Sequence, residues 1–533
     1  MASKADKFFS KNNYQWLVIL LIIVIVLGVG FRFFQLEKKL YWHDEVYTSM
    51  RAAGFTRQEI DNNLFQNRIV TAPELQKYQQ IKPGSTAVDT IQSLAIEDPQ
   101  HPPFYFLMAR FWMQQFGSSR TASRLLPTLL SLLSLPLMYG LAWELFTSHL
   151  IALFATAFIA LSPFDILFAQ TARQYSLLAV IVIGSSWLLL RAMRLQSWKN
   201  WSFYAGAIAL GLYTHPFFIL TAIAQGSFII YDKLFISNIN PKNYQNISNY
   251  FLALTTAIII YTPWIFVLIT NLQRASDTTN WTKISPGFLD IVKLWVLSFT
   301  ALFIDLDFGF DSISTYLLRL PFLLLIAVAI YILYRQTNRT TSLFIITSII
   351  VPFLILALPD IILGGKRSAV SRYLVSCFPG IQLAVAYFLG TKIQTTQRFW
   401  RVVLAATLTA SIVSCTISAF ADTWWSKDLS YFNAEVAQII NKNVANSVSP
   451  KSVIVISDIG DDFTNTGDLI SLSYLLDKNV QLLLLSDSPN FEILKGYSII
   501  FTFRISEKLR LAIEEKQGKL EPIFQYGKLW KLL

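Results

Sequence analysis

Long apolar runs recur along most of the chain and are separated by short polar stretches. Runs such as 16–30 and 402–420 approach the ~20 residues that a helix needs to cross the core of a bilayer. Threading the chain through these runs predicts about eleven spanning helices. They lie near residues 16–36, 122–143, 149–164, 176–193, 201–214, 217–232, 251–270, 315–334, 342–358, 373–390 and 401–421. The pattern therefore predicts a polytopic α-helical membrane protein.

Two more apolar segments, near 103–116 and 288–304, do not fit this alternation. Counting both as spans would raise the total from eleven to thirteen, but it would place Asp165 and Arg173 on the cytoplasmic side. We therefore expect both segments to be short amphipathic helices that lie in the plane of the outer interface.

Two polar pieces of the chain remain, an outer loop at 37–120 and a tail at 422–533. In the tail, short β-branched runs bounded by Asp, Asn and Gly alternate with helix-like segments. The runs lie at 452–457, 480–485 and 497–502, and the helix-like segments at 468–477 and 505–517. This alternation predicts a small α/β domain. We expect residues 1–421 to form a transmembrane domain that carries the large loop, followed by this separate domain.

The composition supports the membrane assignment. Hydrophobic residues make up 54% of the chain and charged residues only 14%, against roughly 25% charged residues in a soluble protein. A soluble enzyme, a disordered chain and a disulfide scaffold are therefore excluded. The two cysteines, Cys377 and Cys415, lie in apolar stretches without metal-ligand spacing and are expected to be inert.

The charge pattern predicts the topology. The formal net charge of +11 would suggest nucleic acid in a soluble protein, but membrane proteins collect Lys and Arg in their cytoplasmic loops, so we expect no nucleic-acid partner. Lys4, Lys7 and Lys11 precede the first apolar run, and no small-residue cleavage site follows it. We expect a cytoplasmic N-terminus, and an odd number of spans then places the tail outside.

The first candidate for chemistry is Asp44-Glu45, at the outer end of the first span. Adjacent carboxylates at a membrane boundary are costly to desolvate and are functional candidates, although a loop end with solvated acids would look the same. His101 precedes a Pro pair in the outer loop, where it is either an ordinary turn residue or a neighbour of Asp44 on the outer face.

A second group of candidates follows at the ends of later spans. Asp165 lies just after Ser162-Pro163-Phe164, and Arg173 and Tyr175 follow at the outer mouth of a span. Arg173 either serves a site or extends to the interface with its apolar stem in the membrane. His215 stands in a very short outer turn, where it is either functional or incidental to a helix break.

The third group is Lys366-Arg367-Ser368-Ala369-Val370-Ser371-Arg372-Tyr373, also in an outer loop. Three cations in an outer loop run against the usual preference of Lys and Arg for cytoplasmic loops, so their presence calls for a structural or functional explanation. One explanation is a structural cluster of salt bridges. Binding of an anion is the other, and Arg holds phosphate with a two-pronged fork.

Together these groups put a carboxylate pair, several cations and many aromatic residues on one face of the membrane. That set suits group transfer from a lipid-linked phosphate. Cations stabilise the leaving phosphate, and one carboxylate serves as the general base for the acceptor hydroxyl. A glycosidase would need two carboxylates that flank the scissile bond.

At these residues the chain resembles the GT-C glycosyltransferases of the family 39 type, which include protein O-mannosyltransferases and lipid A aminoarabinose transferases. The resemblance follows the order of motifs between about residues 16 and 420. The motifs are Asp44-Glu45, His101-Pro102-Pro103-Phe104-Tyr105, Ser162-Pro163-Phe164 with Thr171-Ala172-Arg173-Gln174-Tyr175, Thr214-His215-Pro216-Phe217, and Arg372-Tyr373.

The resemblance implies a GT-C fold and transfer of a sugar from a polyprenyl-phosphate donor in a bacterial plasma (inner) membrane. We expect the transfer to be an inverting single displacement. The resemblance implies Asp44 as the base with Glu45 in support. It also implies that His101, Arg173 and Arg372 contact the donor phosphate. Further candidates for binding the phosphate or the substrate are Tyr175, His215, Lys366, Arg367 and Tyr373. The family's Glu is Thr171 here, so the role of that acid is either absent or passes to Asp165. No metal and no other cofactor is expected.

Two other functions stay open at this stage. A transporter or flippase for lipid-linked glycans would favour charges in mid-membrane and paired broken helices, and no inverted repeat is visible. An assembly subunit could use the acidic loop at Asp458, Asp461 and Asp462, whose spacing does not match a calcium-binding loop. The sugar is undetermined, and the acceptor is a lipid, a protein or a polysaccharide.

Overall fold

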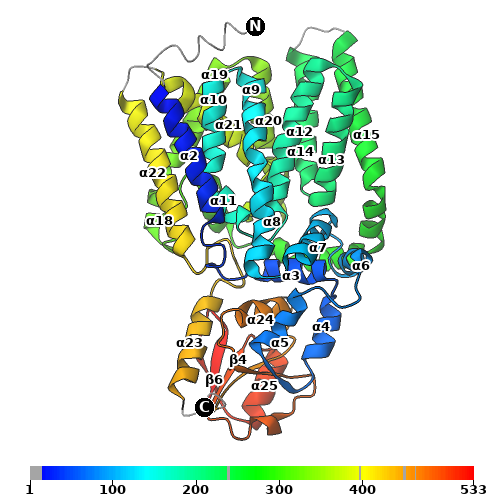
Figure 1. Ribbon diagram of the computed structural model, residues 1–533, viewed down its shortest axis with the longest axis vertical. Helices are drawn as coiled ribbons and strands as arrows, with labels where there is room; N and C mark the ends of the chain where they lie inside the picture. Colours follow the sequence, from blue (N-terminus) through cyan, green and yellow to red (C-terminus); the bar gives the residue numbers. More distant parts are fainter. Residues whose placement is uncertain (1–14, 237–240, 395–397, 448–451, 463) are drawn as a thin grey trace. The chain divides into compact units, whose positions relative to one another are not determined.

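The structure is a computed structural model that describes residues 15–236, 241–394, 398–447, 452–462 and 464–533. Lys4, Lys7 and Lys11 lie outside these residues. The chain divides into two compact units that alternate along the sequence (Figure 1). Unit 1 comprises Met1–Leu36, Gln100–Tyr105 and Arg124–Ala419, and unit 2 comprises Glu37–Pro99, Phe106–Ser123 and Phe420–Leu533.

All the secondary-structure elements of unit 1 in the described residues are helices. Its helices are α2 (Gln15–Phe33), α8 (Arg120–Leu132), α9 (Ser134–Phe146), α10 (His149–Ala160), α11 (Pro163–Ala169), α12 (Tyr175–Leu195), α13 (Trp198–Thr214), α14 (Phe218–Tyr231), η2 (Asp232–Ile236), α15 (Pro241–Thr270), α16 (Leu272–Thr279), η3 (Asn280–Lys283), α17 (Phe288–Thr300), α18 (Ile313–Leu317), α19 (Leu320–Gln336), α20 (Arg339–Leu363), η4 (Arg367–Ala369), η5 (Ser371–Leu374), α21 (Phe378–Lys392) and α22 (Arg398–Phe420). This confirms the predicted polytopic helical fold.

Seven helical segments of the described chain are long and apolar enough to cross a membrane, and the pair α10 and α11, bent by 55°, gives an eighth if it counts as one span. The seven are Gln15–Phe33, Arg120–Phe146, Tyr175–Leu195, Tyr244–Thr270, Ile313–Gln336, Arg339–Leu363 and Arg398–Phe420. The other three predicted spans coincide with α13, α14 and α21, which have 17, 14 and 15 residues. The count of eleven therefore stays a prediction.

The bend between α10 and α11 is held by α2. Arg32, fully buried in α2, donates to the carbonyl oxygens of Ile159 (2.8 Å) and Ala160 at the end of α10. In return Gln170, at the end of α11, donates to the carbonyl oxygen of Phe34 at 2.8 Å. Arg32 thus satisfies carbonyl groups left open at the C-terminus of α10, and Gln170 satisfies one just after the C-terminus of α2. Gly28 permits this contact, because a Cβ there would lie 2.2 Å from the Ala160 oxygen.

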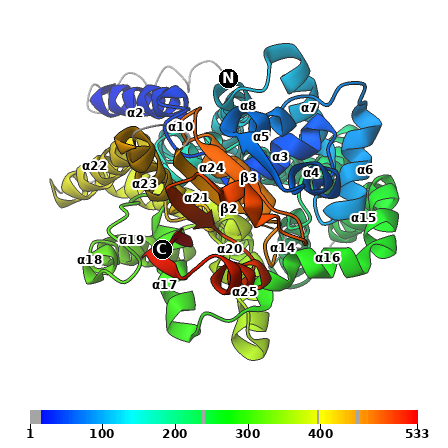
Figure 2. The ribbon, with the colours of Figure 1, turned by 90° about the horizontal axis from the view of Figure 1, so that it is seen from below.

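Unit 2 combines helices with one mixed sheet. Its elements are α3 (His43–Ala53), α4 (Arg57–Leu64), β1 (Arg68–Thr71), α5 (Ala72–Gln76), η1 (Lys77–Gln79), α6 (Ala87–Glu97), α7 (Phe104–Phe116), α23 (Asn433–Asn446), β2 (Val453–Ser457), α24 (Asn465–Ser473), β3 (Gln481–Leu484), η7 (Phe491–Leu494), β4 (Ile499–Phe503), α25 (Glu507–Lys516), β5 (Leu520–Phe524) and β6 (Leu529–Leu532). Helix α24 packs against α3, α5 and α23 (Figure 2).

The six strands follow the order β1-β3-β2-β4-β6-β5. The central strands β3, β2 and β4 are parallel, whereas β1, β6 and β5 pair antiparallel. Every residue of β2 is buried, as expected for a strand covered on both faces. The α/β fold of the tail is confirmed, and β2, β3, β4, α24 and α25 overlap the predicted segments.

The sequence analysis missed the three antiparallel strands. Pro522 interrupts the pattern of β5, and a strand with Pro is tolerated at a sheet edge, which is where β5 lies. Strand β1 comes from the outer loop and pairs with β3 about four hundred residues later, from Arg68 with Leu484 to Thr71 with Gln481. Within the outer loop, Glu37–Pro99 and Phe106–Ser123 therefore group with the tail in unit 2, and Gln100–Tyr105 groups with the helices of unit 1.

Candidate functional site

The predicted base lies at the start of α3, in unit 2. Trp42 is the extended residue before the helix, and Asp44 falls in the first turn, where the positive end of the helix favours a carboxylate. The Asp44 side chain is 17% exposed, and its Oδ1 lies 3.0 Å from Nε2 of His43. Asp44 is thus an accessible carboxylate in a fixed place, as a general base requires.

Glu45 is fully buried and has a different environment. Its Oε2 accepts from the backbone N–H of Trp42 at 3.0 Å, which caps α3, and pairs with Nζ of Lys427 at 3.1 Å. Lys427 also stacks over the Trp42 ring at 5.5 Å. These contacts hold the first turn of α3 and so fit the supporting role predicted for Glu45.

The predicted phosphate ligands lie in unit 1, and the structure brings several of them together. Arg173, before α12, and Arg372, in η5, are only 4% and 6% exposed. His215 lies in the turn between α13 and α14, and its ring is 6.3 Å from that of His101. Burial, then the charges of His101, Arg173 and Arg372, lower the pKa of His215 well below its usual range. Positive charge is therefore concentrated around a neutral imidazole, where an anion would be stabilised.

Aromatic rings line this cationic group. The His215 ring lies 5.8 Å from Tyr175 and 6.3 Å from Tyr373. The Arg372 guanidinium lies over Trp281 and over Tyr373, each at 5.7 Å. The Nδ1 atom of His215 accepts from the backbone N–H of Phe217 at 3.1 Å, so the neutral ring carries its proton on Nε2. His215 can then donate a hydrogen bond without being charged.

Lys366 and Arg367 belong to the same loop but differ in their partners. Lys366 lies over Trp281 at 5.1 Å and so joins the aromatic ring that Arg372 also contacts. Arg367 faces Asp360 of α20, with Nη1 and Oδ1 3.8 Å apart. Buried Asp360 also accepts from the Ser368 N–H at 2.6 Å. The Asp360 carboxylate thus orders the loop. Its pairing with Arg367 is what a structural salt-bridge cluster, the alternative to anion binding, predicts for this loop.

Asp165 stands apart from the cationic group. It accepts from Nε2 of Gln382 at 2.8 Å. With Arg32 and Tyr175 it lines a small pocket. Tyr175 therefore contacts both this pocket and His215, and Asp165 stays a prediction as a second acid.

Four residues with contacts to these groups were missed in the sequence. His43 adjoins Asp44, and fully buried Gln174 lies within the Thr171–Tyr175 motif, with its Nε2 3.3 Å from Nδ1 of His101. Asp360 had a usable signal, since it is a carboxylate inside an apolar helix. Trp281 had none. Among the described residues, no group of three or more His, Cys, Asp or Glu could hold a metal ion.

A comparison with protein families matches residues 100–267 to the model described as dolichyl-phosphate-mannose-protein mannosyltransferase. The matched stretch contains the motifs of His101, Arg173 and His215, and Asp44 and Arg372 lie outside it. No curated protein sequence matches the chain significantly.

Solved structures resemble nearly the whole chain. ArnT from Cupriavidus metallidurans bound to undecaprenyl phosphate is 13% identical with a TM-score of 0.54, and the match covers 98% of each chain. ArnT from the same organism in the apo state is 12% identical with a TM-score of 0.53, and the match covers 97% of each chain. The Archaeoglobus fulgidus oligosaccharyltransferase tethered with an acceptor peptide is 12% identical with a TM-score of 0.51. That match covers 92% of this chain and 69% of the oligosaccharyltransferase chain. The chain therefore has the fold of the GT-C glycosyltransferases, and the resemblance predicted from its motifs is confirmed.

Proposed function

We propose that the protein is a membrane glycosyltransferase that moves a sugar from a polyprenyl-phosphate donor to an acceptor on the outer face of the membrane. The observation that carries the proposal is the group of Arg173, Arg372 and His215 in unit 1. Support also comes from ArnT, whose similar structure holds undecaprenyl phosphate, and from the matched family, which is described by a lipid-phosphate mannose donor.

The reaction is a single displacement. The acceptor hydroxyl oxygen forms a bond to the anomeric carbon, while the bond from that carbon to the phosphate oxygen breaks and its electron pair leaves with the phosphate. Asp44 takes the hydroxyl proton as general base. Attack from the side opposite the phosphate inverts the anomeric centre.

The leaving phosphate needs positive charge and hydrogen-bond donors and no proton. Arg173 and Arg372 supply the charge, and their guanidinium groups match phosphate geometry. His215 donates through Nε2, and His101 and Lys366 add donors around the same aromatic rings. Tyr175 and Tyr373 provide faces for the donor. Arg367 orders the loop through Asp360.

We propose a plasma-membrane location with the N-terminus in the cytoplasm and unit 2 outside. The connections α12–α13 and α19–α20 support this orientation. Arg194 and Lys199 lie in the helix ends that flank the first connection, and Arg335 and Arg339 in those that flank the second, as expected on the cytoplasmic side.

The test uses the full chain in lipid with undecaprenyl phosphate that carries mannose, glucose or aminoarabinose, with lipid, peptide and glycan acceptors. Release of undecaprenyl phosphate is measured for the wild type and for Asp44→Asn. We expect Asp44→Asn to lower release by about 10²- to 10⁴-fold, the usual contribution of a general base. Asp477→Asn, at an exposed position, is the matched control.

Binding of undecaprenyl phosphate tests the cationic group separately. Arg173→Gln and Arg372→Gln should each weaken binding by about tenfold to a hundredfold, since each removes charge-assisted hydrogen bonds. Arg194→Gln, which loses only an exposed pair with Glu144, should bind as the wild type does. Absence of binding and of release across the whole panel would overturn the proposed function, and full activity of Asp44→Asn would overturn the role of the base.

A further inference from the structure

Asp44 has a contact that the proposed reaction does not use. The His43 ring is buried, with 6% of the residue exposed, and its Nε2 lies 3.0 Å from Oδ1 of Asp44. The buried Nδ1 has no hydrogen-bond partner among the described residues. The ring nitrogen that faces the Asp44 carboxylate is thus Nε2, and at 3.0 Å it is close enough to donate a hydrogen bond. His43 therefore restricts the direction in which Asp44 points.

The His43 ring is itself held in place by packing. It meets the ring of Trp42 edge-on at 5.4 Å and that of Tyr47 at 6.4 Å. Trp42 is fixed in turn, because its Nε1 donates to the carbonyl oxygen of Asp428 at 2.8 Å. The imidazole thus has little freedom to turn away from Asp44.

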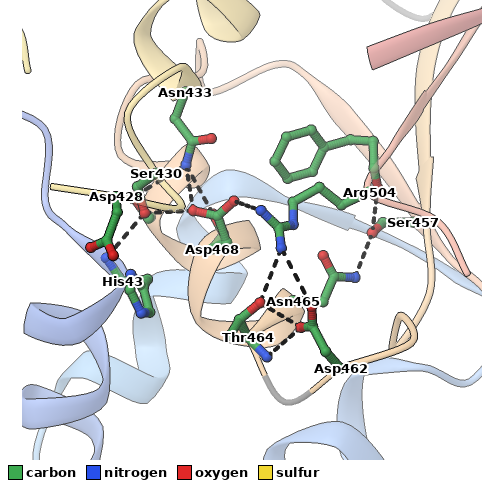
Figure 3. A network of polar contacts seen from close by, with 12 residues as sticks. His43, Asp428, Ser430, Asn433, Ser457, Asp462, Thr464, Asn465, Asp468 and Arg504 are labelled. Carbon is green, nitrogen blue, oxygen red and sulfur yellow. Dashed lines mark hydrogen bonds and ion pairs between the residues drawn. The ribbon is translucent and has the colours of Figure 1, made fainter. Parts of the chain in front are cut away.

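The backbone of His43 is bonded to the tail through a buried polar chain (Figure 3). Its N–H donates to Oγ of Ser430 at 3.2 Å, and that hydroxyl donates to Oδ1 of Asp468 at 2.5 Å. Asp468 also accepts from Asn433 at 2.9 Å and pairs with Arg504 at 3.1 Å. Because Asp468 is fully buried and paired, the hydroxyl that meets His43 is held in one orientation.

A second connection runs parallel to the first. The segment 422–430 lies along the residues that lead into α3, with the Leu40 N–H donating to the Asp422 carbonyl oxygen at 2.8 Å. The buried ion pair of Lys427 with Glu45 belongs to the same segment. The start of α3 is therefore bonded to the tail on both sides of Asp44.

We propose that His43 is a positioning residue for the Asp44 carboxylate, and that the tail fixes His43 through Ser430, Asp468 and Arg504. The inference rests on the proposed function, in which Asp44 is the base. It assigns to the C-terminal α/β segment a part in catalysis, exerted through the geometry of a side chain that the segment itself does not supply.

The first experiment compares His43→Phe, which keeps a ring without a donor, with His43→Gln, whose amide can donate in place of Nε2. The assay measures kcat and KM for each undecaprenyl-phosphate sugar of the panel. We expect His43→Phe to lower kcat by about 100-fold with KM unchanged, as for a misplaced catalytic group. His43→Gln should recover kcat to within about tenfold of the wild type.

The second experiment tests the tail with Ser430→Ala, which removes the acceptor for the His43 N–H. We expect kcat to fall by about tenfold at unchanged KM, and Ser430→Thr to restore it. The matched control is Ser506→Ala, which loses the cap of α25 and the bond to Asp458 but no contact with α3. A general loss of stability would affect the control equally, so an equal fall in kcat for Ser506→Ala overturns the inference.

The outcomes separate the two ideas. If the wild type releases undecaprenyl phosphate and Asp44→Asn is inactive while His43→Phe keeps a normal kcat, the positioning role is overturned. That result leaves the proposed function intact. Activity of Asp44→Asn, or no release from any donor, overturns the proposed function and the inference with it. If His43→Phe does not fold, the comparison of Ser430→Ala with Ser430→Thr decides alone.

Discussion

His215 shows how burial sets the protonation of a single residue in unit 1. It is 2% exposed, and burial together with the charges of His101, Arg173 and Arg372 lowers its pKa well below the ordinary value near 6.5. The ring is therefore neutral at neutral pH, and it presents Nε2–H as a donor. A neutral donor beside two guanidinium groups avoids a third positive charge while the site is empty.

The pH dependence of stability follows from this shift. Since the folded pKa lies below the unfolded one, the unfolded chain binds more protons between the two values, and stability is lost as the pH falls below about 6.5. We expect the unfolding midpoint of the wild type to fall more steeply between pH 7 and 5 than that of His215→Gln. Bound undecaprenyl phosphate should reduce the difference, because its negative charge favours the imidazolium. Identical pH profiles for the two proteins would contradict this prediction. His149→Gln is the matched control.

At the scale of elements, α3 is fixed at both ends and along one face. Its first turn is bonded to residues 422–430, and at its last turn Arg51 pairs with Glu97 and with Asp98, the latter at 2.7 Å. Its side faces α24, where Gly467 lies under the ring of Tyr47. A helix held in this way can keep a catalytic side chain in a constant place.

Close packing at Gly467 gives a direct test of this contact. A Cβ there would lie 2.4 Å from Tyr47 Cε2, so Gly467→Ala must push the ring and α3 away. We expect a loss of about 1–3 kcal/mol in the stability of unit 2, the usual cost of overpacking, together with a lower kcat. Thermal unfolding and the assay of undecaprenyl phosphate release measure the two effects.

Gly206→Ala is the control for that substitution. Gly206 is also helical, but nothing lies within 4 Å of its Cβ position. The added methyl should therefore leave stability equal or slightly higher, as expected for Ala in a helix. Equal behaviour of the two variants would show that α24 does not hold α3 by close contact.

At the scale of the whole molecule, the outer loop and the tail form one folding unit, although 296 residues separate Ser123 from Phe420. The loop contributes one edge strand and the tail the other five. Neither piece can complete the sheet alone, because an isolated edge strand leaves its backbone groups unpaired.

Removal of the tail should therefore abolish transfer. A chain that ends at residue 421 loses the partners of β1, Glu45 and His43, so we expect no release of undecaprenyl phosphate and rapid proteolysis of residues 37–99. A protease site inserted between Asp487 and Ser488, in an exposed turn after β3, is the control. The nicked chain should keep its activity because both fragments stay paired in the sheet. Full activity of the truncated chain would contradict the prediction.

The sequence by itself determined the helical membrane architecture, the alternating strands and helices of the tail and the order of the site motifs. These depend on local physics, since apolar runs and β-branched alternation are properties of neighbouring residues. It also predicted Arg173, His215 and Arg372 as site candidates, and only the structure shows that the charges of both arginines lower the pKa of His215. Only the tertiary structure decided what joins distant segments. Lys427 reaches Glu45 across 382 positions, and Ser430 reaches His43 across 387. No local pattern encodes such pairs, because each side chain acquires its partner only when the sheet that carries the tail has formed.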